Sequence, residues 1–395
     1  GCDPLGPDNA LIISGGILCA TLASATARTH VMAKSPLTGL LGSCNMGGFF
    51  APEMAWAGFH HLVIKGKAEK PCYIYINNGE IEIRDAANIW GKTVTDTQWA
   101  IHDELNDKEV KSLVIGPAGE NLVAYANVMT GVKNAGGRTG MGAVMGSKNL
   151  KAVSCRGTMD VKITHPVEAL EYNKKFIEQI TGAKVNQTQG TLGTPFIWGA
   201  TNSWGGVRTE NFRYNQLEYA DDIEPERIDE IATETMGPYH MAGCFGCQVH
   251  CRAQYKIPSG KYKGKYDEGP EYTSQGAFGA EVGCRSAETV LAGNHLVDQF
   301  GMDNLETGSM IAWAMECFEE GLITKEQTDG IDLSFGNDEA VLEMIERICY
   351  RKGWLGDVLA KGGIPASKNV GKDSFDYLIQ VKGMANLHSD ERGTP

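Results

Sequence analysis

The sequence is poor in positive charge: its 395 residues carry 36 Lys and Arg against 49 Asp and Glu, a formal charge of −13. Nucleic-acid backbones are bound by clustered Lys and Arg, so this deficit argues against a nucleic-acid partner. Long apolar runs are also missing, because the stretch over residues 10–22 is interrupted by Ser14, Gly15 and Gly16 and is too short to cross a bilayer. The sequence therefore predicts a globular protein without a membrane span.

A disulfide framework is absent as well. Most of the eleven cysteines are scattered singly, whereas disulfide scaffolds are short, secreted and dense in cysteine. A reducing cytoplasm fits this pattern better. The chain also has no initiator Met or signal peptide at Gly1 and no closing helix before Pro395, so we expect an internal piece of a longer protein.

Glycine, in contrast, is abundant, with 49 residues or about 12% of the chain against a usual share of roughly 7%. In the first part of the chain, short strands alternate with glycine turns. Two period-two runs flank an Asn-Asn-Gly turn over residues 73–83, which predicts a β-hairpin. Residues 61–64 and 112–115 predict further buried strands, and residues 96–105 a helix with Asp96 as its N-cap.

After residue 163 the periodicity changes from two to 3.6. Long amphipathic segments, several of them followed by glycine, predict helices over residues 167–180, 225–236, 287–300, 307–320 and 339–351. We therefore predict an α+β protein, with a β-rich domain over residues 1–163 and helical domains over residues 164–395.

The most specific motif is a C-x2-C-x3-C run formed by Cys244, Cys247 and Cys251. Three thiolates at this spacing can supply three of the four ligands of a [4Fe–4S] cluster, with the fourth ligand supplied from elsewhere. A zinc site that includes His250 and a chance group of buried thiols are the alternatives. Zinc sites normally show a second ligand pair, which is missing here, so the spacing favours the cluster.

Two glycine-bearing stretches form candidate binding loops. The stretch over residues 133–148 reads KNAGGRTGMGAVMGSK; its backbone can approach an anion closely and Arg138 can contact a phosphate. It matches neither a phosphate loop of nucleotide hydrolases nor a dinucleotide fingerprint, and a glycine turn packed on a sheet is an equal alternative. The earlier stretch combines Arg28 and Lys34 with Asn45 and Gly47, and by itself would also suit a solvated loop.

A third candidate lies at a helix end, where residues 298–304 read DQFGMDN. Gly301 suits a helix C-cap. Asp298 and Asp303 are less expected there, because negative charge at a helix C-terminus opposes the macrodipole. This mismatch suggests that their carboxylates accept hydrogen bonds from the N–H groups of a heterocycle.

Taken together, these motifs resemble the tungsten-containing aldehyde:ferredoxin oxidoreductase family along essentially the whole chain. The positions that match its pterin-contact regions and its cluster motif are Arg28, Asn45, Gly47, Arg138, Thr139, Asp298, Gly301, Asp303, Cys244, Cys247 and Cys251. The likeness implies a saddle-like β domain holding a tungsten (or molybdenum) bis-molybdopterin, an adjacent [4Fe–4S] cluster, and Mg²⁺ between the pterin phosphates, bound by backbone carbonyls of Asn45 and Thr139. A second pterin motif, the fourth cluster cysteine and an active-site histidine would follow Pro395.

The resemblance also implies an activity, the oxidation of an aldehyde to a carboxylate, with electrons passing through the cluster to ferredoxin or an iron–sulfur subunit. Three places depart from the family pattern. Met302 replaces a leucine, and residues 292–295 read AGNH where some members bind an interface iron through E-x-x-H. G-P-E-Y-E places a second glutamate where this chain has Thr273. Glu271, or else Glu268, is the expected proton acceptor.

Two other functions stay open at this point. The tungsten subunit of an aryl-coenzyme A reductase is compatible with Thr273, and a non-catalytic iron–sulfur electron-transfer or scaffold protein would keep the cluster alone. The sequence leaves open whether the protein is a homo- or hetero-oligomer.

Overall fold

The computed structural model describes residues 1–390 and 392, and the chain forms two compact units. The first unit contains Gly1–Gln187 and two segments that return to it, Gly243–His250 and Asp298–Met302. The second unit contains Thr188–Ala242, Cys251–Val297 and the described residues from Asp303 onward. The chain therefore enters the first unit three times.

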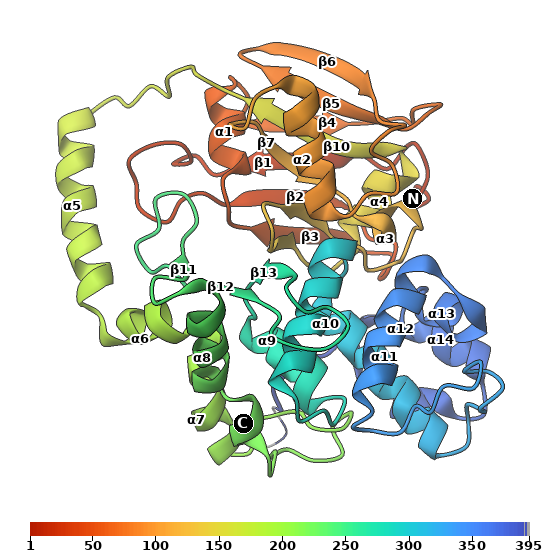
Figure 1. The fold of residues 1–395 in the computed structure, drawn as a ribbon. Helices are drawn as coiled ribbons and strands as arrows, with labels where there is room; N and C mark the ends of the chain where they lie inside the picture. The colour runs from red at the N-terminus through yellow and green to blue at the C-terminus, as the bar shows by residue number, and fades with distance from the viewer. Residues whose placement is uncertain (391, 393–395) are drawn as a thin grey trace. The chain divides into compact units, whose positions relative to one another are not determined.

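Two β-sheets form the framework of the first unit (Figure 1). The four-stranded sheet is antiparallel, with the order β3 (Leu41–Met46), β2 (Thr29–Lys34), β1 (Leu11–Gly15), β4 (His61–Ile64). The six-stranded sheet is mixed, because β10 pairs in parallel with β5. Its order is β6 (Glu80–Asp85), β5 (Cys72–Asn77), β10 (Leu150–Arg156), β7 (Lys111–Val114), β8 (Val128–Thr130), β9 (Asn134–Gly136).

The hairpin expected from the sequence is confirmed, and strands form at residues 61–64 and 111–114. The strand at 111–114 is buried as expected, but the strand at 61–64 is not, because His61 and Val63 are exposed. Strands β5 and β6 pair across a turn at Asn78 and Gly79, whose φ angles of 47° and 91° suit an Asn-Gly hairpin turn. Alternate residues of β2 are buried, and Val31 packs into a core with residues of both sheets. That core includes Leu11, Ile13, Cys44, Met46, Leu113, Val128, Leu150 and Val153.

Helices of the first unit cover these sheets or extend from them. They are α1 (Phe50–Trp56), α2 (Val94–Leu105), α3 (Pro117–Glu120), α4 (Met141–Ser147), α5 (Pro166–Gly182) and the first residues of α6 (Lys184–Leu192). The expected start of α2 was wrong: Thr93, not Asp96, is the N-cap, and its hydroxyl accepts from the Asp96 N–H. The Asp96 carboxylate accepts from the Thr93 hydroxyl at 2.8 Å, so the two residues share the cap.

The second unit is mainly helical, which confirms the predicted α+β class. Its helices are α7 (Trp198–Ser203), α8 (Pro225–Met236), α9 (Tyr272–Gln275), α10 (Ala287–Phe300), α11 (Asn304–Glu319), α12 (Asp338–Tyr350), α13 (Gly353–Leu359) and α14 (Gly363–Val370). Its strands are β11 (Met241–Ala242), β12 (Arg252–Lys256), β13 (Tyr266–Glu268), β14 (Gln380–Val381) and β15 (Met384–Ala385).

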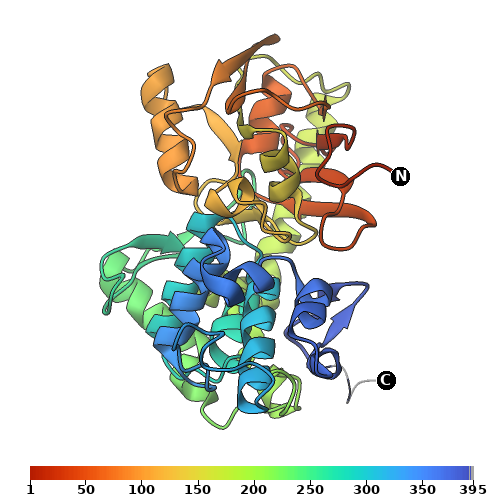
Figure 2. The ribbon, with the colours of Figure 1, turned by 90° about the vertical axis from the view of Figure 1, so that its right-hand side faces the viewer.

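Helix α11 is the core of this unit. Its residues from Leu305 to Cys317 are all buried. Figure 2 shows the helices of this unit, coloured cyan to blue, from a second side. Within the described residues, no helix combines the length and the apolar character that a membrane crossing requires.

Candidate functional site

The first candidate loop lies at one end of the β2–β3 pair. Antiparallel register places Thr29 opposite Met46 and His30 opposite Asn45. Arg28, which precedes β2, and Gly47, which follows β3, therefore emerge at the same end of the two strands. Arg28 and Asn45 are exposed, so their side chains can reach a ligand in solution.

The second candidate loop is a run of left-handed backbone. Arg138, Thr139 and Gly140 follow β9 with φ angles of 65°, 62° and 77°. Left-handed non-glycine residues cost of order 1–3 kcal/mol each and persist where surrounding structure or function demands them. Tight turns of this kind can gather N–H groups into an anion-binding concavity. The loop thus has the backbone geometry expected of a phosphate or heterocycle contact.

Close backbone packing brings these loops together with the end of α10. A Cβ at Gly42 in β3 would lie 3.1 Å from the Thr139 Cβ, so the first strand pair touches the second loop. The Asn127 N–H donates to the Gly301 carbonyl at 2.7 Å. A Cβ at Gly142 would lie 2.2 Å from the Asn127 carbonyl. Asn127 therefore joins the glycine loop to the returning segment Asp298–Met302, and Arg28, Arg138 and Asp298 belong to one compact unit.

Buried polar atoms beside this junction point to a ligand. Thr139 Oγ1 and Asn127 Oδ1 are buried and accept or donate no hydrogen bond among the described residues. Thr139 is 9% exposed and Asn127 2% exposed. Buried polar groups in proteins almost always have a partner, and each exception requires an explanation. A polar cofactor bound against the two loops would satisfy both atoms, so the residues present fit such a group.

The cysteine run lies next to the first loop. A Cβ at Gly47 would lie 2.5 Å from Cys244 Sγ, and the Phe245 N–H donates to the Gly48 carbonyl at 3.2 Å. The backbone turns at Gly246, with φ of 64°, and the Cys247 N–H donates to the Cys244 carbonyl at 3.1 Å. Three half-buried thiols on a turning backbone are a donor set that suits an iron–sulfur cluster.

The three cysteines are divided between the two units. Cys244 and Cys247 lie in the returning segment of the first unit, whereas Cys251 begins the next segment of the second unit. Within the part of the chain that the structure describes, no group of three or more His, Cys, Asp and Glu side chains is arranged to hold a metal ion. The cluster assignment therefore depends on the spacing and the local turn.

The candidate acid–base residues lie in the second unit. Glu268 at the end of β13 forms an ion pair with Arg252 at 2.8 Å and accepts from the Tyr266 hydroxyl at 3.2 Å. Glu271 precedes α9 and accepts a hydrogen bond from the Thr194 hydroxyl. Thr273 accepts from the Asn304 amide at 3.3 Å. A guanidinium thus compensates the charge of Glu268, while Glu271 accepts from a neutral hydroxyl.

The structure corrects our interpretation of Asp303. Its carboxylate accepts from the Leu305 N–H at 3.1 Å and caps the N-terminus of α11, where negative charge is favoured by the helix dipole. Asp298 lies in the last turn of α10, where its negative charge opposes the helix dipole.

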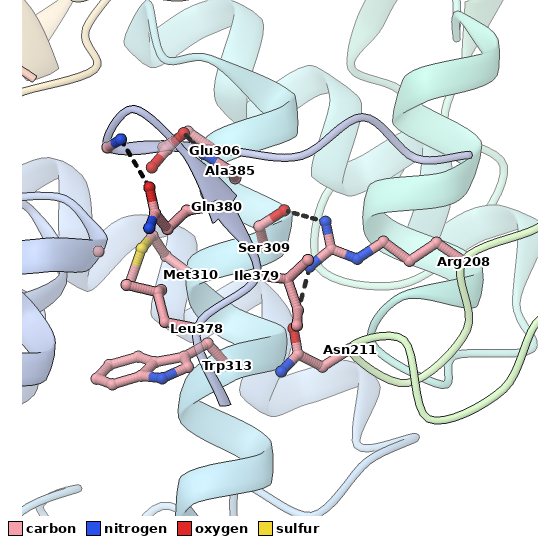
Figure 3. Close-up of a pocket in the computed structure, with 12 residues that line it drawn as sticks. Arg208, Asn211, Glu306, Ser309, Met310, Trp313, Leu378, Ile379, Gln380 and Ala385 are labelled. Atoms are coloured by element: carbon pink, nitrogen blue, oxygen red, sulfur yellow. Dashed lines mark hydrogen bonds between the residues drawn. The ribbon is translucent and has the colours of Figure 1, made fainter. Parts of the chain in front are cut away.

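A buried charged cluster and a cavity lie inside the second unit. Arg208 donates to Ser309 and Asn211, as Figure 3 shows. The guanidinium also pairs with Glu281 at 2.5 Å, and Glu281 lies 2.7 Å from His388 Nδ1. The cavity beside them has a volume of about 10 Å³, which is room for at most one water molecule. Arg208, Glu281 and His388 thus form a buried ion-pair cluster inside the second unit.

Sequence comparison identifies the family of this architecture. Residues 1–157 match the model of the aldehyde ferredoxin oxidoreductase N-terminal domain, and residues 171–395 that of domains 2 and 3 of the same enzymes. The chain belongs to the aldehyde ferredoxin oxidoreductase family. The two matches lie on either side of the boundary expected near residue 163.

Named relatives agree with this membership. Tungsten-containing aldehyde ferredoxin oxidoreductases of Pyrococcus horikoshii and Thermococcus kodakarensis are each 37% identical to the chain over 99% of its length. The WOR-like subunit of an aliphatic sulfonate oxidoreductase from Pyrococcus furiosus is 31% identical over 97%. The chain spans about 63% of the length of the first two relatives.

A solved structure has the same fold. The active-site complex of benzoyl-coenzyme A reductase with 1,5-dienoyl-CoA superposes with a TM-score of 0.86 at 28% identity. The match covers 98% of this chain and 59% of the solved chain. The relatives and the superposed structure are therefore named for different substrates.

Two asparagines of the site were missed by sequence reasoning. Asn127 has no motif around it, and its role follows only from contacts with residues far away in the sequence. Asn134 stands inside the glycine-rich stretch but offers no spacing signal. Predicting the contacts of these two asparagines requires knowledge of which segments pack together in the fold.

Close packing of the glycine loop leads to a stability prediction. Alanine favours a helix over glycine by about 1 kcal/mol, but the Gly142→Ala methyl would meet the Asn127 backbone at 2.2 Å. We expect the clash to dominate and to destabilise the first unit by about 1–3 kcal/mol, measured as a lower Tm of the protein without cofactor. Gly137→Ala is the matched control, because its nearest neighbour is 3.9 Å away. Equal Tm values for the two variants would contradict the described packing.

Proposed function

We propose that the chain is the cofactor-binding part of an oxidoreductase with a tungsten–bis-pterin centre and a [4Fe–4S] cluster. The observation that supports this most strongly is the convergence of both glycine loops, the end of α10 and the Cys244 turn in one compact unit. Family membership supports the same cofactors.

In this proposal the charged residues of the loops hold the cofactor. Arg28 and Arg138 contact the pterin phosphates through guanidinium N–H groups, since these groups match phosphate geometry. Backbone carbonyls of Asn45 and Thr139 would hold a Mg²⁺ ion that balances the phosphate charge. Asp298 accepts hydrogen bonds from pterin N–H groups, next to the turn formed by Gly301. Cys244, Cys247 and Cys251 bind three irons of the cluster.

The proposed reaction is the oxidation of an aldehyde. One aldehyde and one water give a carboxylate, three protons and two electrons. When bound, the tungsten–pterin group would supply the two-electron redox chemistry, and the cluster a path for single electrons to ferredoxin or an iron–sulfur subunit. Glu271 accepts one of the three protons at its carboxylate, which the Thr194 hydroxyl orients by hydrogen bonding. We propose a cytoplasmic location for this chemistry.

A second candidate, the tungsten subunit of an aryl-coenzyme A reductase, is favoured by two observations. Thr273 occupies the position of the family's second glutamate, and the superposed solved structure is named for benzoyl-coenzyme A reductase. In that case Glu271 would deliver a proton to the reduced ring rather than remove one.

One experiment on the full-length protein separates these functions. Iron, tungsten and molybdenum are measured together with the pterin released on denaturation, and turnover is then assayed with an aldehyde plus a viologen dye and with benzoyl-coenzyme A plus reduced viologen. Aldehyde turnover by a tungsten- and pterin-containing protein is the expected result. If benzoyl-coenzyme A is turned over and the aldehyde is not, the protein is an aryl-coenzyme A reductase subunit instead of an aldehyde oxidoreductase. Iron without tungsten, molybdenum or pterin would instead indicate an electron-transfer or scaffold protein.

A further inference from the structure

The side chain of Asn134 contacts a cysteine of the proposed cluster. Its amide nitrogen lies 3.7 Å from Cys244 Sγ and donates a hydrogen bond to the sulfur. Asn134 is only 7% exposed, so water competes little for this contact. The two residues are 110 positions apart in the sequence, and the returning segment Gly243–His250 brings them together.

The surrounding backbone leaves room for this contact and for little else. Asn134 is fixed at the start of β9, where it pairs with Thr130 of β8. A Cβ at Gly47 would lie 2.5 Å from Cys244 Sγ and 3.5 Å from the Asn134 amide nitrogen. Gly48 has φ of 92°, and a Cβ there would lie 3.1 Å from Asn134 Oδ1. Two successive glycines are therefore required where the amide and the sulfur meet.

A donor at this place affects the electron affinity of a cluster. The cluster gains one negative charge on reduction, and part of that charge lies on the cysteine sulfurs. An N–H group that donates to such a sulfur stabilises the reduced form more than the oxidised form and raises the reduction potential.

We propose that Asn134 is a positioning residue of the iron–sulfur centre, where its amide donates to the Cys244 sulfur and raises the reduction potential of the cluster. This proposal rests on the proposed function, because it requires that Cys244 is a cluster ligand. It adds a specific residue that sets how readily the centre accepts an electron.

The test is a redox titration of the full-length protein followed by EPR. Asn134→Leu keeps the approximate side-chain size but removes the donor. At the wild-type midpoint potential, we expect its ratio of reduced to oxidised cluster to fall about threefold to tenfold, which corresponds to about 30–59 mV for a one-electron couple. Asn134→Asp also removes the donor and adds a negative charge, so its potential should fall further. An unchanged potential in both variants, or lower cluster content with an unchanged potential, would overturn the proposal.

A matched control separates this effect from general destabilisation. Asn9 is another buried amide of the same unit, 3% exposed, which donates to the Pro4 and Lys34 carbonyls. Asn9→Leu should lower stability but leave the reduction potential unchanged. A shift in this control equal to that of Asn134→Leu would also overturn the proposal.

A second measurement does not depend on variants. In wild-type protein labelled with ¹⁵N in the asparagine side-chain amides, the reduced cluster should show a weak coupling to one amide nitrogen in pulsed EPR spectra. A cluster without this coupling would refute the hydrogen bond, whereas a protein without any cluster would refute the proposed function itself. The two failures are therefore distinguishable.

Discussion

Replacement of Glu271 by glutamine is expected to reduce kcat of the full-length enzyme by about 10²–10⁴-fold, the usual contribution of a general acid or base. Glutamine has nearly the same shape and can still hydrogen-bond to Thr194, but it cannot accept a proton from the reaction. The effect should appear in kcat more than in KM, because the carboxylate is required for proton transfer. Steady-state kinetics with an aldehyde and a viologen dye provide the measurement.

Two further variants sharpen this prediction. Glu268→Gln should affect kcat less, since Glu268 is already paired with Arg252 at 2.8 Å. Thr194→Val removes the hydroxyl that donates to Glu271 but leaves the carboxylate in place, so it should lower kcat less than Glu271→Gln does. If Glu268→Gln reduces kcat more than Glu271→Gln does, Glu268 is the proton acceptor instead of Glu271.

Glu281→Gln is expected to have the largest effect on stability. Glu281 is fully buried, and so are its partners Arg208 and His388, which are 1% and 2% exposed. Removal of one charge from a buried pair leaves the other uncompensated and costs about 3–5 kcal/mol. We expect a clear loss of Tm for the second unit in calorimetry. Glu319→Gln, which removes a partially exposed partner of Arg213, should cost less than about 1 kcal/mol. A similar Tm for the two variants would contradict this account.

The same carboxylate gives stability a defined pH dependence. Burial alone would raise the pKa of Glu281, but Arg208 and His388 outweigh it and hold the pKa below the ordinary value. A lowered pKa means that the stabilisation is fully present above the ordinary carboxyl range and is lost as pH falls through the folded-state value. Wild-type Tm should therefore fall more steeply with acid below about pH 4–5 than that of Glu281→Gln. Parallel curves would show that Glu281 is not the titrating group.

Local signals account for the parts of the fold that could be predicted. The Asn-Asn-Gly turn defined the hairpin of β5 and β6, and Pro225 and Gly301 marked the start of α8 and the end of α10. The N-cap of α2 was misassigned because Thr93 and Asp96 are both good capping residues three positions apart, and both take part in the cap. Propensity alone does not distinguish them.

Local signals also predicted some residues of the candidate site and missed others. Cysteine spacing and glycine density are local, so they indicated Cys244 and the loop around Arg138. The contacts of Asn127 and Asn134 join residues that are distant in the sequence. The return of Asp298–Met302 to the first unit depends on Gly116, where a Cβ would lie 2.2 Å from the Phe300 carbonyl. No pattern along the chain encodes such an approach of two backbones.

The threefold entry of the chain into the first unit has a consequence for biosynthesis. Its sheets are complete at β10, but its last returning segment ends only at Met302. At about 5–20 residues per second, the ribosome needs roughly 6–23 s to make the residues that separate Gln187 from Met302. The surface at Gly47 stays uncovered until the segment Gly243–His250 is made, and the surface at Gly116 stays uncovered for the whole of that time. Cofactor loading before residue 302 has emerged would therefore meet an unfinished site, which favours insertion after synthesis.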